Sequence, residues 1–420
     1  MESNRNSAVW PPFTQMKTAK EPLEIVRAKD ALLYDRIGKS YIDANSSWWV
    51  NVHGHGNEYL SKSIQDQFKK VDHVLLAGVT HEKVEELAKR VVGILPDHFT
   101  RVFFSDDGST AIEVALKMAF QFWHNQGIPK RRIVALEGAY HGDTFGAMSI
   151  GQRGYFNKPF EHFFFDVDFL EFPTKEKETE ILVKAKVLFE TTEIAGLIVE
   201  PLVQGAAGMR MYSVEFLDKL VALAKENQVQ VIFDEIMTGW GRTGKMFSMD
   251  HGSQKPDIVC LSKGLTGGVL PMGLTVASDK IYEAFLHDET TKALLHGHSY
   301  TGNPLACAVA CANMDLFAKK ETWENIERIV EHHKSFASRI ASHLSVSEVR
   351  QTGTILALEI KTGEATSYFS SLRDEAYDFF VENGILLRPL GNVIFLNPPY
   401  CTTDGELGYC YEKIEEFLNR

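Results

Sequence analysis

The sequence predicts an α/β protein in which a large domain holds a mainly parallel sheet and a smaller α+β domain is assembled from both chain ends. Two patterns carry this prediction. Through the middle of the chain, apolar strand-like runs alternate with helix-like runs, which is typical of a parallel sheet covered by helices on both faces. Both ends instead combine short strands with long helices. The 420 residues exceed one ordinary domain and allow a large core.

The expected strands of the large sheet are short and apolar, and each ends at a polar residue, a glycine or a proline. They are residues 102–104, 132–136, 196–200, 229–233 and 258–261. Apolar residues at helical spacing predict helices over residues 109–123 and 213–225. Residues 171–193 are rich in lysine and glutamate, so we expect a solvated helical insertion there.

The two chain ends read differently from the middle. Alternation from residue 26 to 43 around a Gly38 turn predicts a small meander. After Asn303 we expect helices and strands in the order helix 305–319, helix 322–344, strand 354–360, helix 374–383, strand 385–388, strand 393–396 and a helix from residue 404. The predicted division is therefore residues 1–60 and 311–420 for the small domain and 61–310 for the large one.

Composition excludes several classes of protein. Lys and Arg number 44 against 56 Asp and Glu, a net charge of −12, and no basic patch is visible, so nucleic acid is not an expected partner. No apolar run is long enough for a membrane span, and the first residues contain no secretory signal. The five cysteines are odd in number and lack a Cys-x-x-Cys pair, which favours reduced thiols in a cytosolic enzyme.

Three motifs do not fit their usual interpretations. Residues 239–245 match a glycine-rich phosphate loop, but they begin five residues after a strand ends and no convincing crossover helix follows. The His-Gly-His triplets at 53–55 and 296–298 lack zinc spacing, even with Cys307 and Cys311 nearby. We therefore expect a plain loop and no metal.

Asp234 and Lys263 each stand just past the end of an apolar strand, where open α/β sheets bind ligands. A carboxylate and a primary amine in this arrangement suit pyridoxal 5'-phosphate, which needs a lysine for its Schiff base and a carboxylate at its pyridine nitrogen. The cofactor's phosphate needs a helix N-terminus, and Asp107, Gly108 and Ser109 open an expected helix. Tyr140, just after another strand, could stack on the ring.

At this point the sequence resembles the class III pyridoxal-phosphate aminotransferases. The resemblance begins with Phe-Asp-Glu-Ile at 233–236, the glycines near 241–244 and Ser-Lys-Gly at 262–264, and it runs over nearly the whole chain. It narrows to the branch that serves biotin synthesis through blocks at residues 10–16, 46–49, 140–149, 203–206, 302–307 and 388–391. The implied fold is the type I fold of these enzymes, with a seven-stranded sheet.

The resemblance implies a role for each matching residue. Lys263 would hold the cofactor and act as acid and base, with an amine pKa lowered by burial and the nearby pyridinium. Asp234 would pair with the pyridine nitrogen and Tyr140 would stack on the ring. Asp107, Gly108 and Ser109 would hold the phosphate. The family commonly has serine where Asp107 stands, so we expect only its backbone N–H to make contact.

The family completes the phosphate site from the partner subunit with a Pro-Thr pair, which here is His298-Ser299. Gly297 matches a glycine that contacts substrate. This sharing makes a homodimer the expected unit. Met237 replaces a glutamine common in the family, which argues against the ornithine- and aminobutyrate-type members.

For the substrate, the resemblance implies an aromatic tunnel and a carboxylate site. Phe13, where the family often has tyrosine, would line the tunnel together with Trp48, Trp49 and Tyr140. Arg388 would bind the carboxylate of a long keto acid as a bidentate pair. Asp143 and Arg242 would support the site.

The implied activity is transfer of an amino group from S-adenosylmethionine to 8-amino-7-oxononanoate (7-keto-8-aminopelargonate), which gives 7,8-diaminononanoate (7,8-diaminopelargonate). Three alternatives remain: lysine as the donor, a general ω-aminotransferase, and a relative that binds cofactor but only scaffolds a complex.

Overall fold

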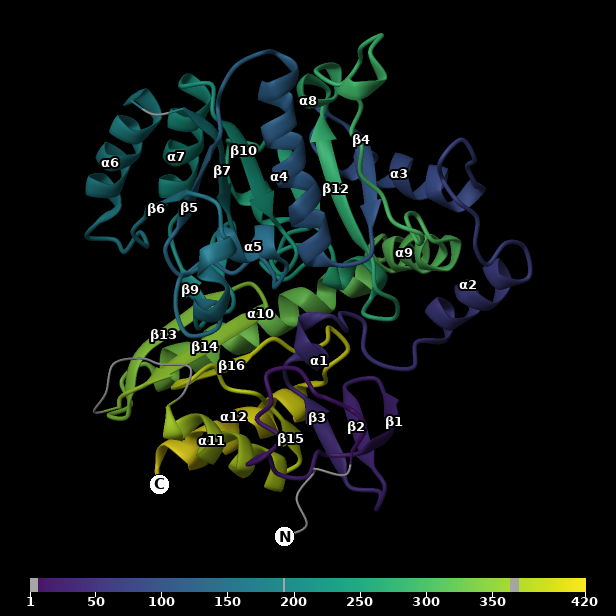
Figure 1. The fold of residues 1–420 in the computed structure, drawn as a ribbon. Helices are drawn as coiled ribbons and strands as arrows, with labels where there is room; N and C mark the ends of the chain where they lie inside the picture. The colour runs from purple at the N-terminus through teal and green to yellow at the C-terminus, as the bar shows by residue number, and fades with distance from the viewer. Residues whose placement is uncertain (1–6, 192, 363–369) are drawn as a thin grey trace.

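The computed structural model describes residues 7–191, 193–362 and 370–420. At its centre lies a seven-stranded sheet with strand order β4-β12-β11-β10-β7-β5-β6 (Figure 1). In chain order the strands are β4 (Phe99–Ser105), β5 (Arg132–Leu136), β6 (Val167–Leu170), β7 (Ile194–Val199), β10 (Gln230–Asp234), β11 (Ile258–Leu261) and β12 (Gly273–Ser278). The predicted mainly parallel sheet is confirmed. β12 is the exception, because it pairs antiparallel with both of its neighbours.

Helices cover this sheet on both faces (Figure 1). They are α4 (Gly108–Asn125), α5 (Phe145–Ser149), α6 (Glu178–Thr191), α7 (Val214–Glu226) and α8 (Asp279–Glu283). α4 lies close to β11 and β12, and its small residues Ala111, Ala115 and Ala119 are fully buried.

Residues 171–193 depart from the prediction of a solvated insertion. α6 packs against α7 and buries Ile181, Ala185 and Phe189, which are spaced four apart along one helical face. Only the outer face carries lysine–glutamate pairs such as Lys184 with Glu180. The charge-rich composition concealed a narrow apolar stripe.

Two smaller sheets are built from both ends of the chain. One has the order β1-β2-β3-β15 and the other β13-β14-β16. Their strands are β1 (Ile25–Lys29), β2 (Leu32–Asp35), β3 (Ser40–Asp43), β13 (Val346–Thr352), β14 (Ile355–Ile360), β15 (Ile385–Leu386) and β16 (Val393–Leu396). β15 pairs parallel with β3, so residues 42–43 and 385–386 lie side by side. This pairing brings the two chain ends together, as Figure 1 also shows.

The remaining elements connect these sheets. They are α1 (Ser46–Trp49), α2 (Glu58–Phe68), α3 (Glu82–Ile94), the hairpin β8 (Val203–Gln204) and β9 (Arg210–Met211), α9 (Pro304–Phe317), α10 (Lys320–Ile340), α11 (Ser371–Glu382) and α12 (Asp404–Leu418). Among the described residues, no helix combines the length and the apolar character that a membrane crossing requires. The domain limits near residues 60 and 310 stay predictions.

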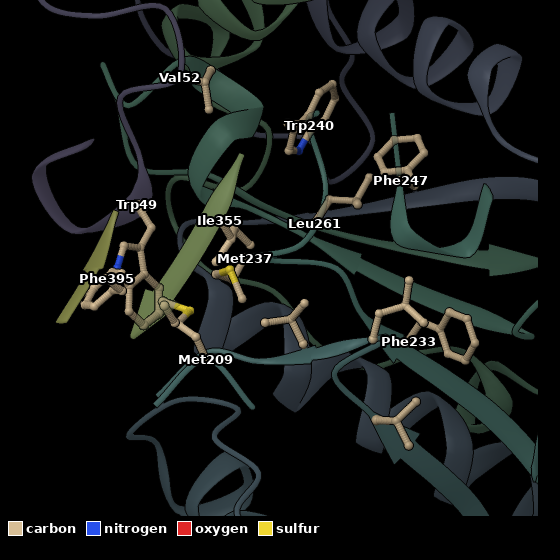
Figure 2. Packing of buried hydrophobic residues seen from close by; sticks show 14 of the residues in the cluster. Trp49, Val52, Met209, Phe233, Met237, Trp240, Phe247, Leu261, Ile355 and Phe395 are labelled. Atoms are coloured by element: carbon tan, nitrogen blue, oxygen red, sulfur yellow. The ribbon is translucent and has the colours of Figure 1, made fainter. Parts of the chain in front are cut away.

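The core continues from the large sheet into the smaller ones. Figure 2 shows Trp49 beside Phe395 of β16, with Ile355 of β14 and Met237 nearby. Trp240 and Phe247 pack edge to face deeper in the same cluster. Residues near the carboxyl ends of the large sheet are therefore held from both sides, which stiffens the region where the site lies.

Candidate active site

Four neighbouring parallel strands each present one site residue beyond their carboxyl end. In the order β11-β10-β7-β5, Lys263 follows β11, Asp234 ends β10, Glu200 follows β7 and Tyr140 follows β5. Parallel strands end at the same edge of a sheet, so these side chains converge. We call this group the sheet edge.

Lys263 is separated from the end of β11 by one residue, Ser262. Its backbone φ is +44°, a value that residues other than glycine rarely adopt. Burial lowers the pKa of its amine, whereas the negative charges of Asp234 and Glu200 act in the opposite direction. Its Nζ lies 5.3 Å from the centre of the Trp49 ring. The site thus holds a primary amine that loses its proton more easily than an exposed lysine does.

His141 fixes the carboxylate of Asp234. Its Nδ1 lies 2.7 Å from Asp234 Oδ2, and the Ile236 N–H donates to Asp234 Oδ1 at 3.1 Å. Both side chains are buried. Sequence reasoning assigned no role to His141, and its only signal was its place next to Tyr140.

Glu200 is a second residue that sequence reasoning missed. It is buried, and its two carboxylate oxygens accept the N–H groups of Tyr140 and Gly205, each at 3.0 Å. Burial and the nearby charge of Asp234 raise its pKa to about 7. Glu200 stands just past an apolar strand, so the rule that singled out Asp234 and Lys263 could have found it.

The N-terminus of α4 is the segment for which the sequence predicts a phosphate cradle, a role that stays a prediction. Asp107 caps this helix, since its Oδ1 accepts the Thr110 N–H at 2.8 Å. The Asp107 N–H, which we expected to contact the phosphate, donates to Thr110 Oγ1 at 3.2 Å. The Gly108 and Ser109 N–H groups take part in no hydrogen bond among the described residues, so they are the donors on offer.

Two close contacts tie this cradle to the sheet edge. A Cβ on Gly108 would lie 3.0 Å from the Ile236 side chain, and one on Gly142 would lie 2.1 Å from Ser109 Oγ. Gly142 also has a φ of +124°, so both its conformation and its space require glycine. The helix N-terminus therefore approaches the strand ends as closely as the chain allows.

Tyr140 borders the sheet edge on its open side. Its hydroxyl donates to Asp143 Oδ2 at 2.8 Å, and 38% of the residue is exposed. Burial and the Asp143 carboxylate raise the pKa of Tyr140 well above its ordinary value, so the phenol keeps its proton. The supporting role expected of Asp143 stays a prediction.

Phe13, Trp48 and Arg388 form a group that we call the aromatic mouth. The rings of Phe13 and Trp48 meet edge to face at 5.8 Å, and the Arg388 guanidinium carbon lies 5.1 Å from the centre of a Trp48 ring. All three residues are exposed. Phe156, which was not expected here, meets Phe13 edge to face at 6.0 Å.

Trp49 differs from its neighbour Trp48. It is only 6% exposed, packs on Phe395 and faces the Lys263 amine, whereas Trp48 is 45% exposed. A Cβ on Gly205 would lie 3.2 Å from Trp49. Trp49 is therefore a wall between core and site.

Arg242 is buried, and its Nη1 donates to the Pro398 carbonyl at 2.8 Å. Its Nη2 lies 3.5 Å from the Trp49 carbonyl oxygen. The supporting role expected of Arg242 stays a prediction.

Gly297, His298 and Ser299 lie in the loop before α9. His298 Nε2 is 3.8 Å from Asp106 Oδ1 of the same chain, and a Cβ on Gly297 would meet open space. Their expected role in a partner subunit stays a prediction. The other histidine triplet is structural, because His53 packs on Phe317 and His55 contacts Asp43.

In the described part of the chain, no group of three or more His, Cys, Asp or Glu side chains could hold a metal ion. The glycine-rich loop at 239–245 leads only into a short 3₁₀ turn, Ser248–His251, so the plain-loop prediction is confirmed.

These residues fit pyridoxal phosphate. A buried amine of lowered pKa, a fixed carboxylate on the neighbouring strand, and free N–H groups at a helix N-terminus are the donor set that this cofactor needs. The strand order and the site together define a pyridoxal-phosphate enzyme of fold type I.

The chain belongs to the class III aminotransferases, whose family model, "Aminotransferase class-III", matches residues 14–418. Members of this family depend on pyridoxal phosphate. The chain is 43% identical to the adenosylmethionine-8-amino-7-oxononanoate aminotransferase of Synechococcus elongatus, over 98% of each chain. It is 38% identical to the protein of that name from Staphylococcus aureus, over 95% of this chain and 93% of that one.

Solved structures of related enzymes have the same fold as this chain. The adenosylmethionine-8-amino-7-oxononanoate aminotransferase of Methanocaldococcus jannaschii superposes with a TM-score of 0.93 at 36% identity, over 98% of this chain and 97% of that one. A PLP-bound amine transaminase from an uncultivated Pseudomonas species has a TM-score of 0.92 at 27% identity, over 99% of each chain.

Proposed function

We propose that this aminotransferase transfers an amino group from S-adenosylmethionine to 8-amino-7-oxononanoate, giving 7,8-diaminononanoate for biotin synthesis. The observation that carries the proposal is the Arg388 guanidinium, which lies against the exposed Trp48 at the aromatic mouth, whereas the Lys263 amine faces the buried Trp49. A keto acid with a long alkyl chain separates its carboxylate from its reacting carbonyl in the same way. The named relatives over nearly the full chain support the same substrate.

Substrate binding divides between charge and aromatic surface. Arg388 pairs with the carboxylate through its planar fork of N–H donors. Phe13 and Trp48 flank the alkyl chain, and burying each methylene contributes about 0.8 kcal/mol. Tyr140 and Trp49 form the inner wall and exclude water from the reacting carbon.

Proton transfer falls to Lys263. When bound, pyridoxal phosphate supplies the electron-withdrawing ring and the carbonyl carbon that carries nitrogen between the two substrates. Lys263 Nζ holds the cofactor at rest and then takes and returns the proton at the substrate carbon, a role that its lowered pKa favours. Asp234, held by His141, keeps a negative charge where the pyridine nitrogen binds.

The phosphate is held by the Gly108 and Ser109 N–H groups and by Ser299 and His298 of the partner subunit. The functional unit is therefore a homodimer whose active sites are shared. Each subunit has two domains with the predicted limits. Residues 61–310 hold the cofactor, and the domain built from the chain ends carries Arg388 and Trp48. The reaction belongs in the cytoplasm, where the five cysteines, all free in this structure, stay reduced.

The donor is S-adenosylmethionine because the aromatic mouth suits it. A sulfonium cation over an aromatic face contributes about 0.5–2 kcal/mol, and stacking of adenine contributes roughly 1–3 kcal/mol. Phe13, Trp48 and Phe156 supply exposed faces for both. Lysine as donor would instead use a carboxylate, and Asp143 is the one at hand.

A single-turnover assay tests the donor. Purified holoenzyme is mixed with each donor separately, and conversion of the cofactor to its amino form is followed by absorbance. S-adenosylmethionine should convert the cofactor and lysine should not; conversion by lysine alone would reverse the assignment. Adding 8-amino-7-oxononanoate should then restore the original absorbance. The solved amine transaminase makes a general amine transaminase the second candidate, and it would show no preference for this keto acid over simple ketones.

A further inference from the structure

The turn that carries both tryptophans has an unusual backbone. Ser46, Ser47, Trp48 and Trp49 have φ angles of +49°, +44°, +74° and +74°. Residues with a Cβ visit this left-handed region as single residues rather than in runs, because the Cβ then crowds the following carbonyl oxygen. Four in succession persist only where surrounding contacts hold them. We call residues 46–49 the left-handed turn.

A buried carboxylate holds this turn from one side. Asp43, the last residue of β3, has no exposed side-chain surface. Its Oδ1 accepts the Ser47 N–H at 2.8 Å, and its Oδ2 accepts the Ser47 hydroxyl at 2.7 Å. Both bonds go to the same residue within the turn, so they oppose its rotation back to the right-handed region.

His55 holds the carboxylate in turn. Its Nε2 lies 2.8 Å from Asp43 Oδ2, and its backbone exchanges two hydrogen bonds with Asp30, at 2.8 and 2.9 Å. Gly54 makes this approach possible, since a Cβ there would lie 2.7 Å from the Asp30 carbonyl oxygen. The His-Gly-His triplet at residues 53–55 is thus explained by this contact.

The same strand end also positions Arg388. Asn45 Oδ1 accepts the Arg388 N–H at 2.7 Å, and Asn45 Nδ2 donates to the Phe395 carbonyl at 2.9 Å. The left-handed turn then sets the Trp48 ring against the Arg388 guanidinium. Asn45 and Ser47, which follow β3, therefore hold the segments that carry Arg388 and Trp48 relative to each other.

We propose that Asp43 and His55 are positioning residues for the keto acid: through Ser47 they hold the left-handed turn that sets Trp48 against Arg388. Neither touches the substrate. The proposal rests on the proposed function, because it assigns the keto acid to the aromatic mouth.

The experiment compares Asp43→Ala, Ser47→Ala and His55→Gln with wild-type holoenzyme in the two half-reactions. Displacing a binding group by about 1 Å can cost about 100-fold, so Asp43→Ala should lower kcat/KM for the keto acid by about tenfold or more. The donor half-reaction should fall by a smaller factor, because in the proposed function the donor also uses the Phe13 and Phe156 faces and does not pair with Arg388. Ser47→Ala and His55→Gln should show the same split with smaller losses.

Asp35→Ala is the matched control. Asp35 also accepts two backbone N–H groups, from Ile37 and Lys39, and one hydroxyl, from Tyr41, but it serves the turn between β2 and β3. It should lower the melting temperature without splitting the half-reactions. The same split in this control would overturn the proposal.

Rescue separates positioning from general destabilisation. Glycine adopts positive φ without the Cβ penalty, so Asp43→Ala combined with Ser47→Gly should recover much of the keto-acid kcat/KM. A double variant that stays as slow as Asp43→Ala, or equal losses in both half-reactions, would contradict the proposal.

A spectroscopic readout keeps the test independent of the substrate. The near-ultraviolet circular dichroism difference between wild type and Trp48→Phe reports the orientation of the Trp48 ring. This difference should vanish when both proteins also carry Asp43→Ala, and it should persist when both carry Asp35→Ala. If wild type fails to use 8-amino-7-oxononanoate, the proposed function fails, and the difference spectrum still decides whether Asp43 sets the turn. A difference that survives in Asp43→Ala refutes the positioning role.

Discussion

The sheet edge and the aromatic mouth are built in different ways. At the sheet edge, neighbouring parallel strands place Glu200, Asp234 and Lys263 side by side at their carboxyl ends. The packed core of the sheet supports these strands. At the aromatic mouth, Phe13, Trp48 and Arg388 come from distant segments, are exposed, and depend on a run of positive φ angles. The sheet edge therefore depends mainly on regular strand geometry, with Lys263 as the one strained position, whereas the proposed substrate-binding surface depends on a run of strained residues.

The difference teaches where substitutions should act. A change at the sheet edge should impair both half-reactions, because each passes through the same amine and carboxylate. A change at the aromatic mouth should impair one half-reaction more than the other, because the two substrates place different groups there. The predictions below test this division, from the largest expected effect to the smallest.

Lys263→Ala should reduce turnover by at least about 10³–10⁴-fold and abolish the absorbance of covalently held cofactor, since no other amine follows a strand end at this edge. The measurement is the visible spectrum together with the rate of each half-reaction. Both rates should fall together. Lys263→Arg is the control that keeps the positive charge without a primary amine, and it should be as inactive as the alanine variant. Residual cycling in either variant would move the catalytic amine elsewhere.

Arg388→Ala should weaken the keto-acid half-reaction selectively. A charge-assisted hydrogen bond contributes about 1.5–3 kcal/mol, or roughly 12- to 150-fold in kcat/KM. The upper values of buried pairs are not expected, because Arg388 is exposed. Arg388→Lys keeps the charge but loses the fork, so it should recover only part of the loss. An equal drop with the donor would break the division between the two regions.

Glu200→Gln should slow both half-reactions by roughly 5- to 30-fold, about 1–2 kcal/mol. Both carboxylate oxygens accept backbone N–H groups, so a glutamine must turn its own NH₂ toward either Tyr140 or Gly205. The expected consequence is a displaced Tyr140. Stopped-flow rates for each half-reaction provide the measurement, and a loss confined to the keto acid would place Glu200 with the mouth instead. Glu137→Gln serves as the control, because Glu137 also follows an apolar strand of the sheet but makes no hydrogen bond to Tyr140 among the described residues.

The smallest expected effect concerns the free energy of unfolding rather than the reaction rate. His333 is fully buried between Tyr411 and the Thr354 carbonyl, and burial lowers its pKa to about 3; His53, also buried, has its pKa lowered to about 3. The unfolded chain, with histidine near 6.5, binds more protons below that pH than the folded chain does. These two histidines should therefore lower the free energy of unfolding as the pH drops below 6.5, by up to about 1.4 kcal/mol per pH unit each. Glu200, whose pKa is raised to about 7, contributes in the opposite direction below pH 7, so the histidine contribution is measured as the difference between wild type and a histidine variant.

Urea unfolding at pH 7.0, 6.0 and 5.0 measures this slope. His333→Gln should reduce it by one proton. A slope that does not change in this variant would mean that His333 is not the group responsible.

Much of the fold followed from periodicity. β5 and β11 begin and end where the apolar runs predicted, and α4, α7 and α9 lie within two residues of their expected limits. β12 was not among the predicted strands, and nothing in its six residues records the direction in which it enters the sheet. α6 was misjudged because its charged outer face outweighs three buried apolar residues in the composition.

For the site, the sequence by itself determined Asp234, Lys263 and the α4 N-terminus, because a residue type at a strand end or a helix start is a local property of the chain. Tertiary structure alone decided the rest. Trp48 and Trp49 are identical neighbours in the sequence, yet one is exposed beside Arg388 and the other buried beside Phe395. His141 and Asp43 act through hydrogen bonds to residues 93 and 12 positions away. Such contacts depend on how the chain returns to itself, and no pattern of neighbouring residues encodes that.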